Sequence, residues 1–136
     1  MRDMERGSVV ADAATVRGRG EYRTRHGFGY SVFEHQQGGI ESSLRVFVDR
    51  ERPVKFWQLR LVNRSAVRRH LQITGYAEWI AGDLKQKTAL HVVSWQDAGS
   101  RALLARNTYN HAGDPRTLFL MSACTSAVSV MTASSS

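Results

Sequence analysis

From residue 22 onward, apolar and polar residues alternate in short runs that turn-forming residues separate. The clearest run is IESSLRVFV, in which the apolar residues fall on alternate positions over most of its length. One side of this run carries Ile40, Leu44 and Val46, and the other carries Glu41 and Arg45. A period of two residues is that of a β-strand, so the run is predicted to form a half-buried strand.

A preceding strand is predicted in GYSVFEH, residues 29–35. Tyr30 and Val32 would share one face of this strand, and Phe33 would lie on the other. The stretch QQGG that follows supplies a turn through Gly38–Gly39, so the two strands are expected to form a hairpin. The residues just before GYSVFEH are interpreted as its entry loop.

Two longer runs follow, at residues 54–63 and 70–82. In the first, Trp57, Leu59 and Leu61 share one face. The charged stretch DRERP separates this run from the strand before it, since its proline cannot donate to a β-ladder. The two runs are expected to pair with each other as a long antiparallel hairpin.

Weaker strand patterns occur in ALHVVSW, ALLARNTY and TLFLMSA, with turn sequences QDAGS and NHAGDP between them. No amphipathic helix is evident. Seven or eight short strands with turns about every ten residues are typical of an all-β protein, and the predicted fold class is an antiparallel β-sandwich. Its expected limits are residues 22–122, with a leader or loop at 1–21 and a disordered Ser/Ala/Thr tail at 123–136.

The chain has 136 residues and a net charge of +7, and 16 of its 19 cationic residues are arginine. A basic protein can bind nucleic acid, an anionic membrane surface or an acidic ligand. These arginines are scattered among other residues, which favours a charged exterior over a local binding patch.

Cys124 is the one cysteine, so the chain has no internal disulfide and a reducing compartment is permitted. No stretch reaches the roughly 18 apolar residues of a membrane helix. The expected location is cytoplasmic, with attachment to an inner membrane only through a larger parent protein.

Catalytic and metal-binding patterns are weak. The five histidines are spread along the chain without a cysteine partner, no strained nucleophile turn is present, and the glycines near residue 20 lack the strand and helix of a phosphate loop. Carboxylates that could act in pairs are Glu34, Glu41, Glu78 and Asp83. Isolated strand carboxylates are usually solvated or ion-paired, so we expect no catalytic residue, no metal and no cofactor.

Aromatic residues are the other chemical resource, because their rings stack on sugars and on bases. Tryptophan at strand spacing is more often part of a core. Both interpretations stay open for Trp57, Trp79, Trp95, Tyr22, Tyr30, Tyr76 and Tyr109.

Several ordered blocks together carry a family resemblance. RHGFGYSVFEH, then GIESSLRVFVDRERPVKFWQLRLVNRSAVRRHLQITGYAEWIAGD, then HVVSW and ALLARNTYN resemble the N-terminal β-sandwich of the glycoside phosphorylases once grouped as glycosyltransferase family 36. The likeness extends to the phosphorylase-like region of cyclic β-1,2-glucan synthases and spans residues 22–120.

This resemblance implies a supersandwich of two antiparallel sheets, of the galactose-mutarotase-like class. In that family the domain precedes a helical (α/α)-barrel that carries the general acid, and parts of the sandwich help to close the sugar site. The family's sandwich is longer than this chain, and the barrel and its general acid have no counterpart here. The chain is therefore expected to be an incomplete sandwich, with open sheet edges that favour self-association.

The carbohydrate-contacting residues are expected at two strand ends, because Arg and Asn donate to sugar hydroxyls and Tyr offers a stacking face. They are Arg25, His26 and Tyr30 at the first, and Arg106, Asn107 and Asn110 at the second. The opposing interpretation is that Arg25 and His26 only cap a strand and that Tyr30 is core.

Three functions remain open from the sequence. The first is an accessory domain of a carbohydrate-active enzyme that binds or frames a glucan, with the catalytic barrel of its parent enzyme as partner. The second is a nucleic-acid-binding β-barrel, whose affinity would fall steeply with salt. The third is a structural remnant that binds neither ligand.

Overall fold

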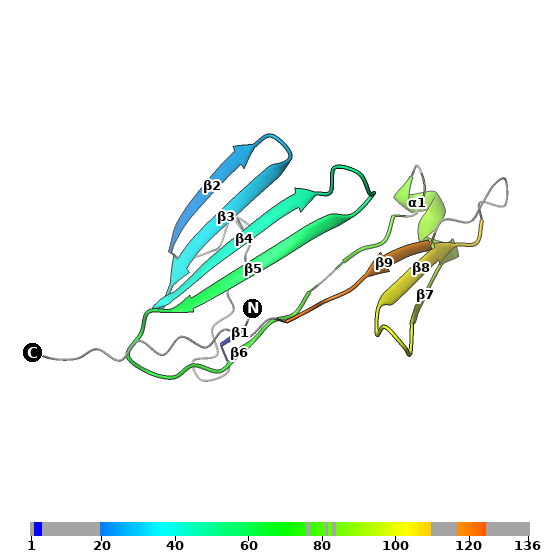
Figure 1. Ribbon diagram of the computed structural model, residues 1–136. Coiled ribbons are helices and arrows are strands. Elements are labelled where there is room, and N and C mark those ends of the chain that lie inside the picture. Colours follow the sequence, from blue (N-terminus) through cyan, green and yellow to red (C-terminus); the bar gives the residue numbers. More distant parts are fainter. Residues whose placement is uncertain are drawn as a thin grey trace, which may run out of the picture. The chain divides into compact units, whose positions relative to one another are not determined.

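The computed structural model describes residues 2–3, 20–75, 77–80, 82, 84–109 and 117–124. The chain forms two compact units, residues 1–75 and 76–136. Every strand pairing among the described residues is antiparallel, and helical structure there is confined to a few residues of the second unit (Figure 1). The predicted all-β, antiparallel class is confirmed.

The first unit is built around a four-stranded sheet in the order β2-β3-β4-β5 (Figure 1). Its strands are β2 (Glu21–Gly27), β3 (Tyr30–Gln37), β4 (Ile40–Val48) and β5 (Lys55–Asn63). Two shorter strands, β1 (Arg2–Asp3) and β6 (Leu71–Gln72), pair with each other.

Residues opposite each other in an antiparallel ladder share a face, so the register separates the two faces of this sheet. One ladder row joins Phe33, Leu44 and Leu59, and a neighbouring row on the same side joins Val46 to Trp57. We call this side the apolar face. The opposite side, the polar face, carries most of the arginines and glutamates of the four strands. The faces predicted for residues 40–48 and 55–61 are confirmed.

A two-residue turn, Gly38–Gly39, joins β3 to β4 as predicted. Both glycines have positive φ angles, 58° and 81°, a conformation that costs a residue with a Cβ atom about 1–2 kcal/mol. The side of Gly39 on which a Cβ would project is occupied by Ser65, whose own Cβ would lie 3.0 Å away. The turn therefore requires glycine most strictly at its second position.

The buried part of the sheet lies beside this turn. Ile40 is buried, as are the polar residues His35 and Ser42 of the next row on the same face. The Tyr22 ring stacks on the His35 ring with centroids 3.9 Å apart. The Ser42 hydroxyl donates to the His35 carbonyl oxygen at 3.4 Å. Ring stacking and polar contacts thus anchor the row where β2, β3 and β4 meet.

The second unit contains a three-stranded sheet in the order β7-β8-β9. These strands span Val92–Gln96, Leu103–Asn107 and Thr117–Leu120, and a short helix α1 (Lys85–Thr88) with a 3-10 turn η1 (Ala89–His91) precedes them. Ala105 in the central strand is fully buried, and Ala102 just before it is also buried. Three predicted strand runs are thereby confirmed, although the first begins at Val92, after the helical turn.

Residues 70–82 do not pair with β5, and that prediction was wrong. β5 pairs with β4, and within the described part of 70–82 only β6 is a strand. The loop before β5 explains the difference. The Asp49 N–H donates to the Val54 carbonyl oxygen at 2.8 Å, which folds β5 back onto β4. Alternation reports a half-buried face but does not identify the neighbouring strand.

The entry loop expected before Tyr30 is also a strand. β2 pairs with β3 along its whole length, and Phe28–Gly29 forms the turn between them, with a φ of 77° at Gly29. The domain limits of 22–122 and the tail at 123–136 stay predictions, and most of residues 1–19 and the tail lie outside the described residues.

Candidate functional site

Arg25 lies in β2 on the polar face of the four-stranded sheet. Its Nη2 donates to Oε1 of Glu34 in β3 at 2.6 Å. Glu34 faces Arg23 in the ladder, one row from Arg25 on the same side, so the ion pair runs diagonally between the strands. Both side chains are partly exposed, and such pairs contribute about 0.2–1 kcal/mol.

Tyr30 begins β3 on the same polar face. A Cβ added to Gly27, its ladder partner, would collide with the Tyr30 ring, so the ring lies across a residue that has no side chain. The Arg45 guanidinium carbon lies 5.2 Å from the Tyr30 ring centroid and 5.4 Å from that of Phe47. Arg45 therefore binds both rings through cation–π contacts.

Phe56 of β5 extends this row of rings. It lies opposite Phe47 in the ladder, and the two rings stack with centroids 5.0 Å apart and an interplanar angle of 19°. Tyr30 and Phe56 are 41% and 42% exposed, so rings remain accessible at both ends of the row. We call Arg25, Tyr30, Glu34, Arg45, Phe47 and Phe56 the arginine–aromatic surface.

His26 does not join this surface, because consecutive strand residues face opposite sides. It lies on the apolar face, where its Nδ1 is 2.9 Å from the Ser31 hydroxyl. Its ring meets that of Phe33 edge-on, at 84° and 6.2 Å between centroids. The structure thus brings together Arg25 and Tyr30 from the first predicted set and places His26 behind them.

The second predicted set lies in the other unit. Arg106 of β8 is exposed, donates from Nη2 to the Thr117 hydroxyl at 3.1 Å, and lies 5.9 Å from the Trp95 ring centroid. Asn107 is buried, and its Oδ1 accepts the Tyr109 N–H at 2.9 Å, so it shapes the end of β8. Asn110 lies outside the described residues.

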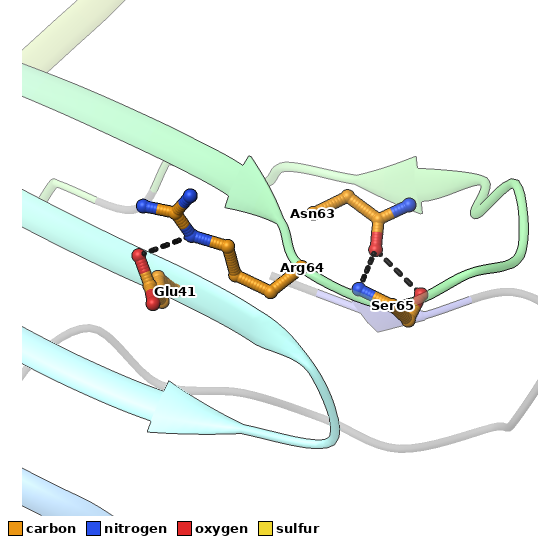
Figure 2. Close-up of polar contacts among 4 residues, drawn as sticks. All are labelled: Glu41, Asn63, Arg64 and Ser65. Carbon is orange, nitrogen blue, oxygen red and sulfur yellow. Dashed lines mark hydrogen bonds and ion pairs between the residues drawn. The ribbon is translucent and has the colours of Figure 1, made fainter. Parts of the chain in front are cut away.

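The candidate carboxylates are held by cations rather than by each other. Glu34 pairs with Arg25, and Glu78 with Lys85 at 2.7 Å. Figure 2 shows the third pair, in which Arg64 Nε donates to Glu41 Oε2 at 3.1 Å. Asp83 lies outside the described residues.

The residues that follow β5 fix the position of Arg64. Its backbone N–H donates to the Gly39 carbonyl oxygen at 2.8 Å. Next to it, Asn63 Oδ1 accepts both the N–H and the hydroxyl of Ser65, at 3.0 and 2.6 Å (Figure 2). This loop holds the end of β5 against the β3–β4 turn and lies at that end of the polar face.

Among the described residues, two carboxyl groups have a lowered pKa: Asp49, in the turn between β4 and β5, and Asp97, in the turn between β7 and β8. The backbone N–H groups of Glu51 and Arg52 lower the pKa of Asp49. The hydroxyl of Ser100, followed by its backbone N–H, lowers the pKa of Asp97. Their carboxylates act as turn acceptors, so the shifts report on structure rather than on catalysis.

Among the described residues, no group of three His, Cys, Asp or Glu side chains could hold a metal ion. In the same part of the chain, no helix is both long enough and apolar enough to span a bilayer.

Sequence reasoning missed Arg45, Phe47 and Phe56. Their alternation along β4 and β5 was visible, but their contact with Tyr30 depends on the register across β3, β4 and β5. A predicted hairpin of β4 and β5, with the charged stretch DRERP as its turn, would have placed Phe47 opposite Phe56. Of the aromatic residues left open, Tyr30, Trp57, Trp95 and Tyr109 are exposed, Tyr22 and Trp79 are half-buried, and Tyr76 lies outside the described residues.

Comparisons with known proteins match most of the residues described above to one family. Residues 1–135 match the family described as glycosyl hydrolase 94, supersandwich domain. The cyclic β-(1,2)-glucan synthase NdvB of Rhizobium meliloti (strain 1021) is 38% identical over 112 residues, which is 81% of this chain and 4% of that protein.

Two phosphorylases show shorter similarities. Solabiose phosphorylase of Paenibacillus borealis is 38% identical over 58 residues, covering 43% of this chain and 8% of that protein. N,N'-diacetylchitobiose phosphorylase of Vibrio furnissii is 28% identical over 79 residues, covering 58% of this chain and 10% of that protein. No solved structure matches the chain.

The chain thus corresponds to a small part of each of these relatives, and the family match extends over almost all of its own length. The resemblance drawn from the sequence blocks is confirmed, and so is the supersandwich class. This chain belongs to the glycosyl hydrolase 94 supersandwich domain family.

Proposed function

We propose that this chain is an accessory, non-catalytic domain that binds or frames a glucan for a glucan-processing glycosyltransferase or phosphorylase. The family match over residues 1–135 carries the proposal. The similarity to a cyclic β-(1,2)-glucan synthase points to a β-1,2-linked glucan as ligand. The ion pairing of Glu34, Glu41 and Glu78 supports a role without catalysis.

The arginine–aromatic surface is the proposed contact. Sugar rings present apolar C–H faces that pack on aromatic rings, and their hydroxyls accept from guanidinium groups. Tyr30 and Phe56 supply accessible rings, and Arg25 and Arg45 supply donors that their present partners already orient. Arg106, beside Trp95 in the second unit, is proposed as a separate and smaller contact.

The catalytic partner is part of the same proposal. A helical (α/α)-barrel of the parent enzyme would hold the general acid, while this domain would close one side of the sugar site. A cytoplasmic location, with attachment to the inner membrane through the parent protein, is proposed with it.

Titration with β-1,2-linked gluco-oligosaccharides tests the proposal, followed by calorimetry and by backbone amide shifts. We expect weak binding that is insensitive to salt, because the ligand carries no charge. The Tyr30→Ala and Arg45→Ala variants should each weaken binding about fivefold, which corresponds to a loss of about 1 kcal/mol.

The matched control is Tyr109→Ala. It also removes an exposed tyrosine, but one in the second unit, whose ring stacks on that of His91 with centroids 4.7 Å apart. Equal loss of affinity in both tyrosine variants would contradict the assignment to the arginine–aromatic surface. Binding of single-stranded DNA that falls steeply with salt, without a glucan response, would favour the nucleic-acid alternative. Binding of neither ligand would favour a structural remnant.

A further inference from the structure

β5 has one side that no other strand of the described residues covers, since the sheet order ends with it. Hydrogen bonds at both ends of the β4–β5 ladder show which residues of β5 bond to β4. The Arg64 N–H donates to the Gly39 carbonyl oxygen, and the Asp49 N–H donates to that of Val54. Bonded and non-bonded pairs alternate in an antiparallel ladder. The bonded members of β5 are therefore Phe56, Gln58, Arg60 and Val62.

The remaining residues of β5 direct their backbone N–H and C=O groups away from β4, toward the open edge. They are Lys55, Trp57, Leu59, Leu61 and Asn63. These same residues carry their side chains on the apolar face. Within the described ranges no strand pairs with these backbone groups, so the edge presents them beside an apolar strip, and Trp57 within it is 60% exposed.

The two edges of the sheet differ in how far they discourage pairing. β2, at the other edge, carries three charged residues, Glu21, Arg23 and Arg25, on one face. β5 carries two charged residues, Lys55 at its first position and Arg60, and it has no proline or bulge across its nine residues, which all pair in register with β4. Charges, prolines and bulges are the usual means by which edge strands avoid pairing. β5 has few of them.

The sequence of β5 is also complementary to itself. In an antiparallel pairing with a two-fold axis at Leu59, Leu59 lies opposite its own copy and Trp57 lies opposite Leu61. On the polar face, Phe56 lies opposite Val62, and Gln58 lies opposite Arg60. No like charges meet, and Leu59, Trp57 and Leu61 form bonded pairs that use the outward backbone groups. A shift of the axis to Trp57 or Leu61 shortens the overlap.

We propose that two copies of this chain associate through their β5 edges in this register, which joins two four-stranded sheets into one continuous sheet. The apolar face continues across the junction, where Trp57 of one copy lies opposite Leu61 of the other, and on the polar face the row of rings ends against Val62 of the other copy. The association needs no glucan, so its test is independent of the test of the proposed function.

Sedimentation of the full chain from roughly 1 μM to roughly 1 mM tests the association, since weak dimers populate within that range. We expect a reversible monomer–dimer equilibrium. A monomer at every concentration would overturn the proposal.

Amide hydrogen exchange identifies the edge that pairs. At low concentration the amides of Gln58 and Arg60 should be protected by β4, and those of Trp57, Leu59 and Leu61 should exchange quickly. At high concentration the second group should gain protection. A dimer that leaves these three amides unprotected uses another surface, and that result would also overturn the proposal.

Charge variants test the register. In Gln58→Lys two lysines would face the Arg60 side chains of the other copy, and in Gln58→Glu the new pairs would attract. The dissociation constant of the dimer should rise about three- to tenfold in Gln58→Lys and fall by a similar factor in Gln58→Glu, as expected for two cross-strand pairs. Gln36→Lys is the matched control, because Gln36 is exposed on the same face of β3, which is paired on both sides. Equal effects at positions 36 and 58 would reject this register.

Discussion

At the scale of single residues, Asp97 shows how one carboxylate organises a turn. Its Oδ2 accepts the N–H of Ser100 at 2.7 Å and the Ser100 hydroxyl at 2.6 Å. Its own N–H donates to the Ala102 carbonyl oxygen, and its carbonyl accepts the N–H of Arg101. Arg101 has a φ of 59°, the left-handed conformation. The ionised carboxylate compensates for a backbone that a non-glycine residue disfavours.

The pKa of Asp97 is lower in the folded chain than its ordinary value of 3.8. Its contribution to stability is therefore complete above that value and is lost as the pH falls through the lower, folded pKa. The Ser100→Ala variant keeps the backbone donor and removes the hydroxyl, so the pKa of Asp97 should rise toward 3.8. Carboxyl carbon shifts followed by NMR over an acid titration measure the change.

Asp49 serves as the internal reference in that titration. Its pKa is lowered by the backbone donors of Glu51 and Arg52, which the substitution leaves in place. A parallel rise at Asp49 would show that the variant disturbs the whole chain. An unchanged pKa at Asp97 would show that the hydroxyl bond is not what lowers it.

Residue types in the sequence did not decide which candidate site residues share a face. Arg25 and Tyr30 were expected together and share the polar face, whereas the adjacent His26 cannot, because of the same two-residue period that located the strand. Arg45 was not expected, since its distance from Tyr30 depends on strand register. Asn107 was expected to be accessible, and its side chain instead accepts a backbone N–H.

At the scale of elements, the β3–β4 hairpin depends on its two glycines in different ways. Both Gly38 and Gly39 have positive φ, but open space surrounds the Cβ position of Gly38, while that of Gly39 faces Ser65. The first glycine is needed for its conformation. The second is needed for its conformation and its size.

Substitution of alanine at each glycine should separate these two requirements. Gly38→Ala should lower the free energy of unfolding by about 1–2 kcal/mol, and Gly39→Ala should lower it further, because Ser65 must move. Urea denaturation followed by circular dichroism measures both. Gly75→Ala, where a Cβ meets nothing within 4 Å, is the control and should change stability by less than about 0.5 kcal/mol. Equal losses at positions 38 and 39 would contradict the role of Ser65.

The strands themselves were predictable where one face is apolar and the other polar. This holds for β4 and β5, whose faces were predicted correctly. β2 was missed because a strand such as EYRTRHG, polar on both faces, has no alternation to detect. The pairing of residues 70–82 was wrong because the loop Asp49–Val54, not the pattern of the strand, decides which neighbour β5 takes.

At the scale of the whole molecule, few of the hydrophobic residues that the structure describes are fully buried. Among the described residues, the buried hydrophobic ones are Ile40, Ala102 and Ala105, and two of these are alanines. Large apolar side chains such as Trp57 and Phe119 are instead exposed. Because apolar burial is the main favourable contribution to folding, the isolated chain should be marginally stable.

The dye ANS, which binds exposed apolar surface, should therefore fluoresce strongly with the isolated chain under native conditions. Its urea unfolding should be shallow and begin at low denaturant. Compact proteins of similar size with a well-packed core, which do not bind the dye, are the reference. A steep transition without dye binding would show that the apolar side chains are covered in solution.

Trp57 is a fluorescent residue at the β5 edge of the first unit. It is the one tryptophan within residues 1–75, whereas Trp79 and Trp95 belong to the second unit. With both of the latter replaced by phenylalanine, the emission of the chain would come from Trp57 alone. The wavelength of maximum emission would then report how far water surrounds Trp57 in β5, without any attached label.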